Sequence, residues 1–218
     1  MIKTTIKIDV ISDVVCPWCY IGKRRLEKAL NKLDSEYTFE VTYHPFELNP
    51  SIPESGVNQK QYLSQKFGGE ERYEKITAHV TQVAAEEGIT FNFHKQAVSP
   101  NTRTAHRIIQ LAKHVDKQAE VKEAFMKAYF TDGVDLTKMD NLIAIAQHAG
   151  LEGEIVAQLI SGKQGVAEVI QAEKEIQQIG ITGVPFYIVQ SKYGLSGAQP
   201  PEAFIEVIQK AALENASV

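Results

Sequence analysis

Both cysteines of the 218-residue chain stand in one short motif, Cys-Pro-Trp-Cys, at positions 16–19. Directly before it, residues 6–10 alternate apolar and polar side chains, which predicts a strand. Proline is favoured at the first position of a helix, so Pro17 indicates that a helix begins inside the motif. Apolar residues at helical spacing extend this helix over 17–34. The two thiols are therefore expected one helical turn apart, where a strand gives way to a helix.

The order of the elements defines the fold class. Residues 38–44 alternate again, so strand, helix and strand form a βαβ unit with a right-handed crossover. At the other end of the chain, strands are expected at 185–189 and 191–197, followed by a helix that Pro200 and Pro201 open. The helix is expected to bury Phe204, Ile205, Val207, Ile208, Ala211 and Ala212.

Between these two halves the chain is mostly helical. The predicted helices are 58–67, 70–87, 102–115, 117–131, 138–149, 152–161 and 164–179, and residues 89–95 are expected to form a short extended piece. We therefore predict an α/β fold whose βαβ and ββα halves are separated by a large all-helical insertion. The predicted domains are 1–50 with 178–218, and the insertion 51–177.

Net charge and hydropathy indicate which partners and which cellular compartment to expect. The formal net charge is −4, which gives no reason to expect a nucleic-acid partner. No apolar run approaches the roughly 20 residues of a membrane span, and the N-terminus lacks the apolar stretch of about 7–15 residues of a signal peptide. We expect a soluble cytoplasmic protein. Structural disulfides are rare in that compartment, so a close cysteine pair there is more often catalytic or metal-binding.

The position of the two thiols predicts different roles for them. The free N–H groups and the dipole at a helix N-terminus favour negative charge, so Cys16 is expected to lose its proton more easily and act as the nucleophile. Cys19 lies one turn deeper and is expected to resolve the mixed disulfide that Cys16 forms.

Three other interpretations of the pair remain open. A zinc site needs a second pair of ligands, but the chain has no further cysteine, and its six histidines lack the usual ligand spacing, so no metal is expected. Two inert core thiols, or a regulatory disulfide in some other enzyme, are the remaining alternatives.

A second feature lies near the other end of the chain. Val184-Pro185 stands at the entrance to the strand 185–189. Proline cannot donate to a sheet ladder, and a cis peptide here would turn the backbone of Val184 outward to pair with an extended substrate. A simple proline at the start of a strand is the alternative.

These features together resemble the DsbA family of thioredoxin-fold oxidoreductases. The resemblance covers nearly the whole chain and rests on Cys-Pro-Trp-Cys, the long helical insertion and Thr-Gly-Val-Pro-Phe at 182–186. The segments 44–50, 101–107, 127–133 and 196–199 are similar to the FrnE-like branch. The resemblance implies that Cys16 is the nucleophile, that Cys19 is the resolving thiol and that Pro185, preceded by Val184, is a cis-proline beside them.

Kappa-class glutathione transferases and hydroxychromene-carboxylate isomerases are similar in architecture. They have a serine where this chain has Cys16 and no thiol where it has Cys19, which argues against them.

Other residues are weaker candidates. Pro17 and Trp18 lie between the thiols and are expected to contact substrate, although Trp18 could equally be packed. Asp13 could accept or relay the proton of Cys19, but an exposed loop position is the simpler interpretation. The segment 101–107 offers three further candidates, Asn101, Arg103 and His106, which could line a cleft between the insertion and the redox domain. Alternatively, Asn101 caps a helix and the other two lie on its solvent-exposed face. Tyr129 and Phe130 are expected in the core.

The predicted function is dithiol–disulfide exchange on protein or small thiols. No cofactor is expected beyond the Cys16–Cys19 disulfide, with glutathione as a candidate co-substrate. The alternatives are a glutathione-dependent isomerase or transferase acting on an aromatic or polyketide-like molecule, and a redox-regulated binding protein or chaperone. The sequence leaves the substrate, the direction of electron flow and the oligomeric state open.

Overall fold

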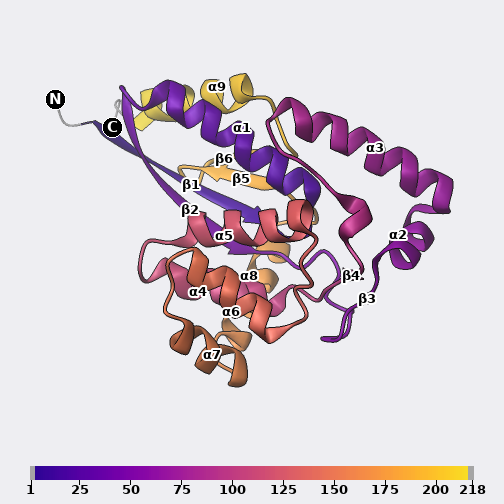
Figure 1. Cartoon of the computed structure of the whole chain (residues 1–218). Helices are drawn as coiled ribbons and strands as arrows, with labels where there is room; N and C mark the ends of the chain where they lie inside the picture. The colour runs from indigo at the N-terminus through magenta and orange to yellow at the C-terminus, as the bar shows by residue number, and fades with distance from the viewer. Residues whose placement is uncertain (1–2, 216–218) are drawn as a thin grey trace.

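A computed structural model describes residues 3–215 and has a four-stranded sheet at its centre (Figure 1). The βαβ unit consists of β1 (Thr4–Ser12), α1 (Pro17–Leu33) and β2 (Tyr37–Pro45). β1 and β2 are parallel, and Val10 is paired with Tyr43. The alternation of apolar residues in both strands explains this register, because it places Ile6, Ile8 and Val10 of β1 on one buried face.

The C-terminal half completes the sheet in the order β2-β1-β5-β6. β5 (Phe186–Val189) is antiparallel to β1, β6 (Tyr193–Ser196) forms a hairpin with β5, and α9 (Pro201–Asn215) follows. Helices α1 and α9 lie side by side on one face of the sheet (Figure 1). Phe204 and Ile208 of α9 are fully buried, as predicted, whereas Ile205 and Val207 are only half-buried.

The segment between the two halves is helical over most of its length. Its helices are α2 (Gln59–Phe67), α3 (Glu70–Glu86), α4 (Arg103–Lys113), α5 (Gln118–Lys127), α6 (Met139–His148), α7 (Gly153–Ser161) and α8 (Val166–Gln178). Ile176 of α8 packs in a small apolar cluster with Ile11 of β1, on the sheet face opposite α1 and α9. The predicted fold class is confirmed.

Two local predictions in this segment need correction. The insertion is not all-helical, because β3 (Val57–Asn58) and β4 (Val98–Ser99) form a short antiparallel pair. The short extended piece expected at 89–95 does not continue to its end, because Phe93–Lys95 form the 3₁₀ turn η1. The N–H of Asn92 donates to the carbonyl of Phe130, 2.7 Å away, in the π-helical turn η2 (Ala128–Asp132), so this backbone pairs with a turn rather than a sheet.

One hydrophobic core joins all three parts of the chain. It includes Ile8 of β1, Phe125 of α5 and Phe204 of α9. The division into domains at 1–50, 51–177 and 178–218 stays a prediction, and its outermost residues, 1–2 and 216–218, lie outside the described residues. Within residues 3–215, no helix has both the length and the apolar character needed to cross a membrane.

An ionic cluster fixes α5 of the insertion against α1. The carboxylate of Glu123 on α5 accepts hydrogen bonds from Lys23 and Arg24 at 2.7 Å each and from the Tyr20 hydroxyl at 2.6 Å. Charge-assisted bonds of this kind set the relative orientation of two helices. The cluster therefore positions the helix that carries Lys122 against the helix that carries Cys19.

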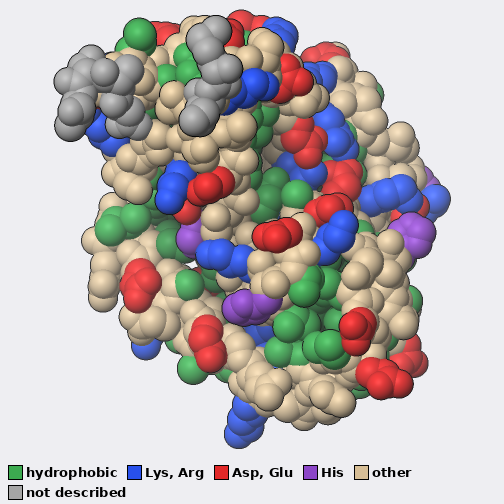
Figure 2. Space-filling view, turned by 90° about the vertical axis from the view of Figure 1, so that its left-hand side faces the viewer, with side chains coloured by type: hydrophobic (Ala, Val, Ile, Leu, Met, Phe, Trp, Pro, Cys, Tyr) green, Lys and Arg blue, Asp and Glu red, His purple; other side chains and the backbone are tan. Residues whose placement is uncertain are grey.

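On the face drawn in Figure 2, Lys and Arg side chains are interspersed with Asp and Glu rather than gathered into one basic area. The described ion pairs follow the same pattern, since exposed lysines such as Lys32 and Lys75 contact glutamates. Mixed charges of this kind produce no strong single-sign field over the face.

Close packing between α1 and β5 depends on a glycine. A Cβ atom on Gly22 would lie 2.1 Å from the Tyr187 hydroxyl and 3.3 Å from Cγ of Pro185. Tyr187 is fully buried, and its hydroxyl has no hydrogen-bond partner within the described chain. The absence of a side chain at Gly22 therefore lets β5, which follows Pro185, approach α1, which carries Cys19.

We expect Gly22→Ala to lower the free energy of unfolding by about 1–3 kcal/mol through overpacking, although alanine favours a helix over glycine by about 1 kcal/mol. Tyr187→Phe removes the clashing oxygen without breaking a hydrogen bond, so Gly22→Ala should cost much less in that background. Urea denaturation of the two single variants and the double variant measures the coupling. Additive effects would contradict this packing account.

Candidate functional site

Cys16 is the N-cap of α1, with extended backbone angles of φ −93° and ψ 112°, and Pro17 is the first helical residue, as predicted. The carbonyl of Cys16 accepts the N–H of Cys19 at 3.0 Å, which closes the first turn. The first N–H groups of a helix have no partner inside the helix, so they and the helix dipole favour a negative charge at Cys16. Both cysteines are free thiols in this structure.

The two thiols differ in access. Both are largely buried, with 4% of Cys16 and 2% of Cys19 exposed, but only Cys16 lines a neighbouring cavity. Burial raises the pKa of the Cys19 thiol well above its usual range, and neighbouring Cys16 raises it further. A molecule in the cavity thus meets Cys16, while Cys19 is held protonated behind it.

The segment before β5 contacts the thiol at the position that the sequence predicted. The Val184–Pro185 peptide bond is cis, and the Cys16 thiol donates to the carbonyl of Val184 at 3.8 Å, a distance suited to sulfur. Val184 also lines the cavity. Cys16 and Val184, which are 168 positions apart in the sequence, therefore lie side by side in the site. The role of Val184 and Pro185 in substrate binding stays a prediction.

Asp13 lies beneath the thiols and is fully buried, so the prediction of an exposed loop residue was wrong. Its carboxylate contacts Nε2 of His106 at 3.2 Å and accepts the N–H of Leu48 at 2.8 Å. Burial alone would raise its pKa, but the contact with His106, this N–H and the charge of Lys122 together hold the pKa of Asp13 below its usual value. The carboxylate is therefore kept charged.

Lys122 of α5 is a second buried ion, which the sequence did not indicate. Its ammonium donates to the carbonyl of Ser12 at 3.1 Å, and none of its side chain is exposed. Burial lowers the pKa of Lys122 to about 8, although the nearby Cys19, Asp13 and Cys16 favour its charged form. Conversely, the charge of Lys122 opposes the rise in the pKa of Cys19.

The candidates from the segment 101–107 do not line the cavity beside Cys16. Asn101 accepts the N–H of Arg103 at 3.0 Å and donates to the carbonyl of Ile52 at 3.1 Å. Arg103 donates from Nε to Glu47 at 2.8 Å. None of Asn101, Arg103 and His106 lines this cavity, and Asn101 instead accepts the first N–H of α4, in line with the alternative of a capping residue. Asn101 and Arg103 connect the start of α4 to the chain that follows β2, whereas His106 connects α4 to Asp13 after β1.

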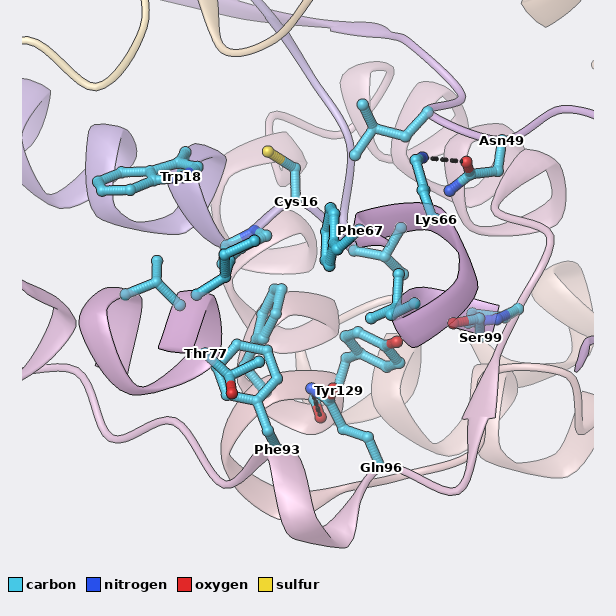
Figure 3. A pocket seen from close by; sticks show the side chains of 18 of the residues that line it. Cys16, Trp18, Asn49, Lys66, Phe67, Thr77, Phe93, Gln96, Ser99 and Tyr129 are labelled. Carbon is cyan, nitrogen blue, oxygen red and sulfur yellow. Dashed lines mark hydrogen bonds between the residues drawn. The ribbon is translucent and has the colours of Figure 1, made fainter. Parts of the chain in front are cut away.

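The cavity beside Cys16 has a volume of about 350 Å³ and lies between the start of α1 and the insertion (Figure 3). Trp18, which is 36% exposed, forms one side of it together with Pro17. Tyr129 and Phe130 are buried, as expected, and also line it. Sequence reasoning missed the contributions of Asn49, Lys66, Phe67, Ile76, Phe93, Gln96 and Ser99. Helical periodicity shows that such residues have a buried side, but it does not show which cavity they face.

Among the described residues, no three His, Cys, Asp or Glu side chains converge in a way that would hold a metal ion. The arrangement instead offers thiol chemistry: one reachable thiol, one shielded thiol and a buried lysine whose pKa lies near that of a thiol.

The sequence model of the "DSBA-like thioredoxin domain" family matches residues 7–209. A probable DsbA oxidoreductase from Streptomyces coelicolor is 31% identical, with 96% of this chain and 91% of that chain covered and a TM-score of 0.89. A 2-hydroxychromene-2-carboxylate isomerase is 14% identical (97% and 98% covered, TM-score 0.70). The cytosolic disulfide reductase DsbM from Pseudomonas aeruginosa, solved with GSH, is also 14% identical (94% and 98% covered, TM-score 0.66). At that identity, the last two similarities show the fold alone.

A carboxylate near the site, Glu173, responds to pH. Glu173 of α8 accepts the N–H of Glu47 at 2.6 Å, and Glu47 is buried with one carboxylate oxygen unpartnered in the described chain. Burial and the charge of Glu47 raise the pKa of Glu173 to about 7. A raised folded-state pKa in an acid means that the folded protein binds the proton more tightly than the unfolded chain does.

The stabilisation from this proton is complete below the ordinary pKa of 4.5 and is lost as the pH rises through about 7. We therefore expect the free energy of unfolding of the wild type to fall relative to that of Glu173→Gln between these pH values. Glu168 is an exposed carboxylate on the same helix, so Glu168→Gln is the control. The difference in free energy of unfolding between the wild type and Glu168→Gln should not change over the same pH range. Denaturant melts at a series of pH values provide the measurement, and parallel curves for wild type and Glu173→Gln would contradict it.

Proposed function

Because the chain belongs to the DSBA-like thioredoxin domain family and presents one reachable and one shielded thiol a helical turn apart, we propose that it catalyses thiol–disulfide exchange through Cys16 and Cys19. The observation that carries the proposal is the difference in access between the two thiols. Disulfide exchange by a dithiol needs this asymmetry, since one sulfur must attack the substrate and the other must attack the resulting mixed disulfide.

In the first step, the Cys16 thiolate attacks one sulfur of the substrate disulfide. A bond forms between Cys16 and that sulfur, the substrate S–S bond breaks, and the other half leaves as a thiolate. In the second step, the Cys19 thiolate attacks the Cys16 sulfur and expels the second half. Two electrons pass from the protein to the substrate, and the two thiol protons end on the released thiols. The same steps in reverse would oxidise a dithiol.

The buried ions act mainly on the second step. Cys19 must lose its proton before it can attack, and burial opposes this. The charge of Lys122 favours the Cys19 thiolate, and the pKa of Lys122, about 8, suits its neutral form to act as a base for a thiol proton. Asp13 suits this role less because its pKa is held low. We therefore propose that Asp13 and His106 position the end of β1, and that Lys122 tunes Cys19.

We further propose that the protein needs no cofactor, works in the cytoplasm and is returned to its starting redox state by a small thiol such as glutathione. The cytosolic location of DsbM, and GSH in its structure, support this setting by analogy. The assignment to the FrnE-like branch stays a prediction. A glutathione-dependent isomerase is the second candidate, since 2-hydroxychromene-2-carboxylate isomerase shares the fold. The presence of both thiols favours exchange over isomerisation.

The proposal is tested by substituting each thiol. Cys19→Ser should accumulate mixed disulfides through Cys16, because the resolving step is gone, and Cys16→Ser should accumulate almost none, because the remaining thiol is shielded and protonated. Mass spectrometry after incubation with an excess of a disulfide counts the adducts. Equal trapping by both variants would refute the assigned roles. Loss of insulin-disulfide reduction in both variants, with activity in the wild type, would distinguish an exchange enzyme from a binding protein.

Lys122→Met tests the tuning of Cys19. Without the nearby charge the pKa of Cys19 should rise further, so less of Cys19 is thiolate at neutral pH. The attack of Cys19 on the mixed disulfide should then slow by roughly two- to fivefold, because the greater nucleophilicity of a more basic thiolate offsets only about half of this loss. The rate at which a small thiol is released from a mixed disulfide on Cys16, followed against pH, measures this step. Lys127→Met, an exposed lysine on the same helix, is the control. An unchanged pH profile in Lys122→Met would contradict the tuning role.

A further inference from the structure

The cavity beside Cys16 has an aromatic wall that the exchange chemistry itself does not require. Phe67, Phe93, Tyr129 and Phe130 line it, and Phe91 packs on Phe130 from behind, with ring centroids 4.7 Å apart. Its volume of about 350 Å³ lies at the lower end of the range of about 300–1,000 Å³ for small-molecule sites. Such a wall suits a bulky apolar group, because small-molecule pockets are lined mostly by hydrophobic and aromatic side chains, which offer a large contact area.

A positively charged side chain, that of Lys66, also lines the cavity. Lys66 of α2 is the single charged residue among the described residues that line the cavity. Its ammonium donates to the side-chain oxygen of Asn49 at 2.6 Å and lies 5.8 Å from the ring centroid of Tyr62. Within residues 3–215 it makes no ion pair with a carboxylate, unlike Lys60 of the same helix, which pairs with Glu70. Lys66 therefore keeps a charge that an anionic group in the cavity can meet.

The thiol lies between these two features. In Figure 3, Cys16 stands at the rim of the cavity, with Trp18 on one side and the Lys66–Asn49 pair on the other. Only 4% of Cys16 is exposed, so the surface of a folded protein would have to displace neighbouring side chains to reach it. A small molecule reaches it through the cavity.

We propose that this site acts on low-molecular-weight disulfides, and the corresponding thiols, whose organic group is aromatic and carries a carboxylate. The aromatic group would fill the cavity, the carboxylate would meet Lys66, and one sulfur would lie against Cys16. This substrate class rests on the proposed function. The electrons and protons follow the two steps of exchange given above: one disulfide is reduced to two thiols, and Cys16 and Cys19 become a disulfide.

Two matched disulfides test whether the charge of Lys66 contributes to substrate recognition. Bis(para-carboxyphenyl) disulfide and bis(para-carbamoylphenyl) disulfide share size and shape but differ in charge. The second-order rate constant for one turnover of the fully reduced protein is measured at low salt, so no external reductant enters the reaction. Lys66→Gln should slow the reaction of the carboxylate by about three- to fivefold, the ratio equivalent to an exposed ion pair of up to about 1 kcal/mol. It should leave the carboxamide unchanged.

Lys60→Gln removes the same charge from the same helix away from the cavity, and it should change neither rate. In the wild type, added salt should lower the ratio of the rate constant of the carboxylate probe to that of the carboxamide probe. The ratio should approach the value found for Lys66→Gln, because ions screen exposed charge pairs.

A second pair of variants tests the apolar wall. Ile76 lines the cavity and is 42% exposed, whereas Ile155 on α7 is 45% exposed and lies outside it, so both can be changed to serine with little effect on folding. Ile76→Ser should slow both aromatic disulfides by about two- to fourfold through lost apolar contact, and it should spare hydroxyethyl disulfide. Ile155→Ser should leave all three rates unchanged.

The outcomes separate the two proposals. If Cys16 reduces hydroxyethyl disulfide but Lys66→Gln affects the two aromatic probes equally, the substrate class is wrong and the exchange function stands. Faster reduction of insulin than of either aromatic disulfide would also overturn the substrate class. If no disulfide reacts through Cys16, the proposed function fails and the substrate class fails with it.

Discussion

Two buried ions beneath the thiols, Asp13 and Lys122, impose the constraint on which the site depends. An ion removed from water costs several kcal/mol unless it is paired or hydrogen-bonded. Asp13 meets this requirement through His106 of α4 and the N–H of Leu48, and Lys122 through the carbonyl of Ser12. The end of β1, two helices of the insertion and the chain after β2 must therefore assemble together. The thiols obtain their surroundings only in that assembled state, which makes the insertion part of the redox site.

The same burial gives the two thiols different reactivities. Cys16 faces the cavity at the N-terminus of α1, whereas burial raises the pKa of Cys19 and Lys122 opposes that rise. A shielded thiol that stays protonated does not compete for substrate. It becomes a nucleophile when the mixed disulfide brings a sulfur within reach and its proton leaves. The lysine thus keeps the deeper thiol usable at a depth where burial alone would suppress it.

The sequence predicted the parts of this arrangement that arise from local patterns. The alternation in β1, Pro17 at the first helical position and the two thiols one turn apart lie within a few residues of one another. Asp13 stands in the loop after the predicted strand, where an acidic side chain is usually exposed, and the histidine that contacts its carboxylate is 93 residues away. Lys122 bonds a carbonyl 110 residues away and lies on a helix whose other lysine, Lys127, is exposed. Periodicity carries no information about such pairs, nor about the two-residue strands β3 and β4.

Different elements supply the reactive thiol and the wall of the cavity that faces it. Its thiol comes from the start of α1 and its backing carbonyl from Val184, while the facing wall comes from α2, α3 and the turns η1 and η2 of the insertion. Under the proposed function, changes in that facing wall would alter which molecule reaches the sulfur without altering the helix N-terminus or the buried ions near the two thiols. Solved proteins of the same fold at 14% identity are described as a disulfide reductase and as an isomerase. The fold alone therefore does not identify the reaction, and the function of this chain is inferred from its cavity wall and its thiols together.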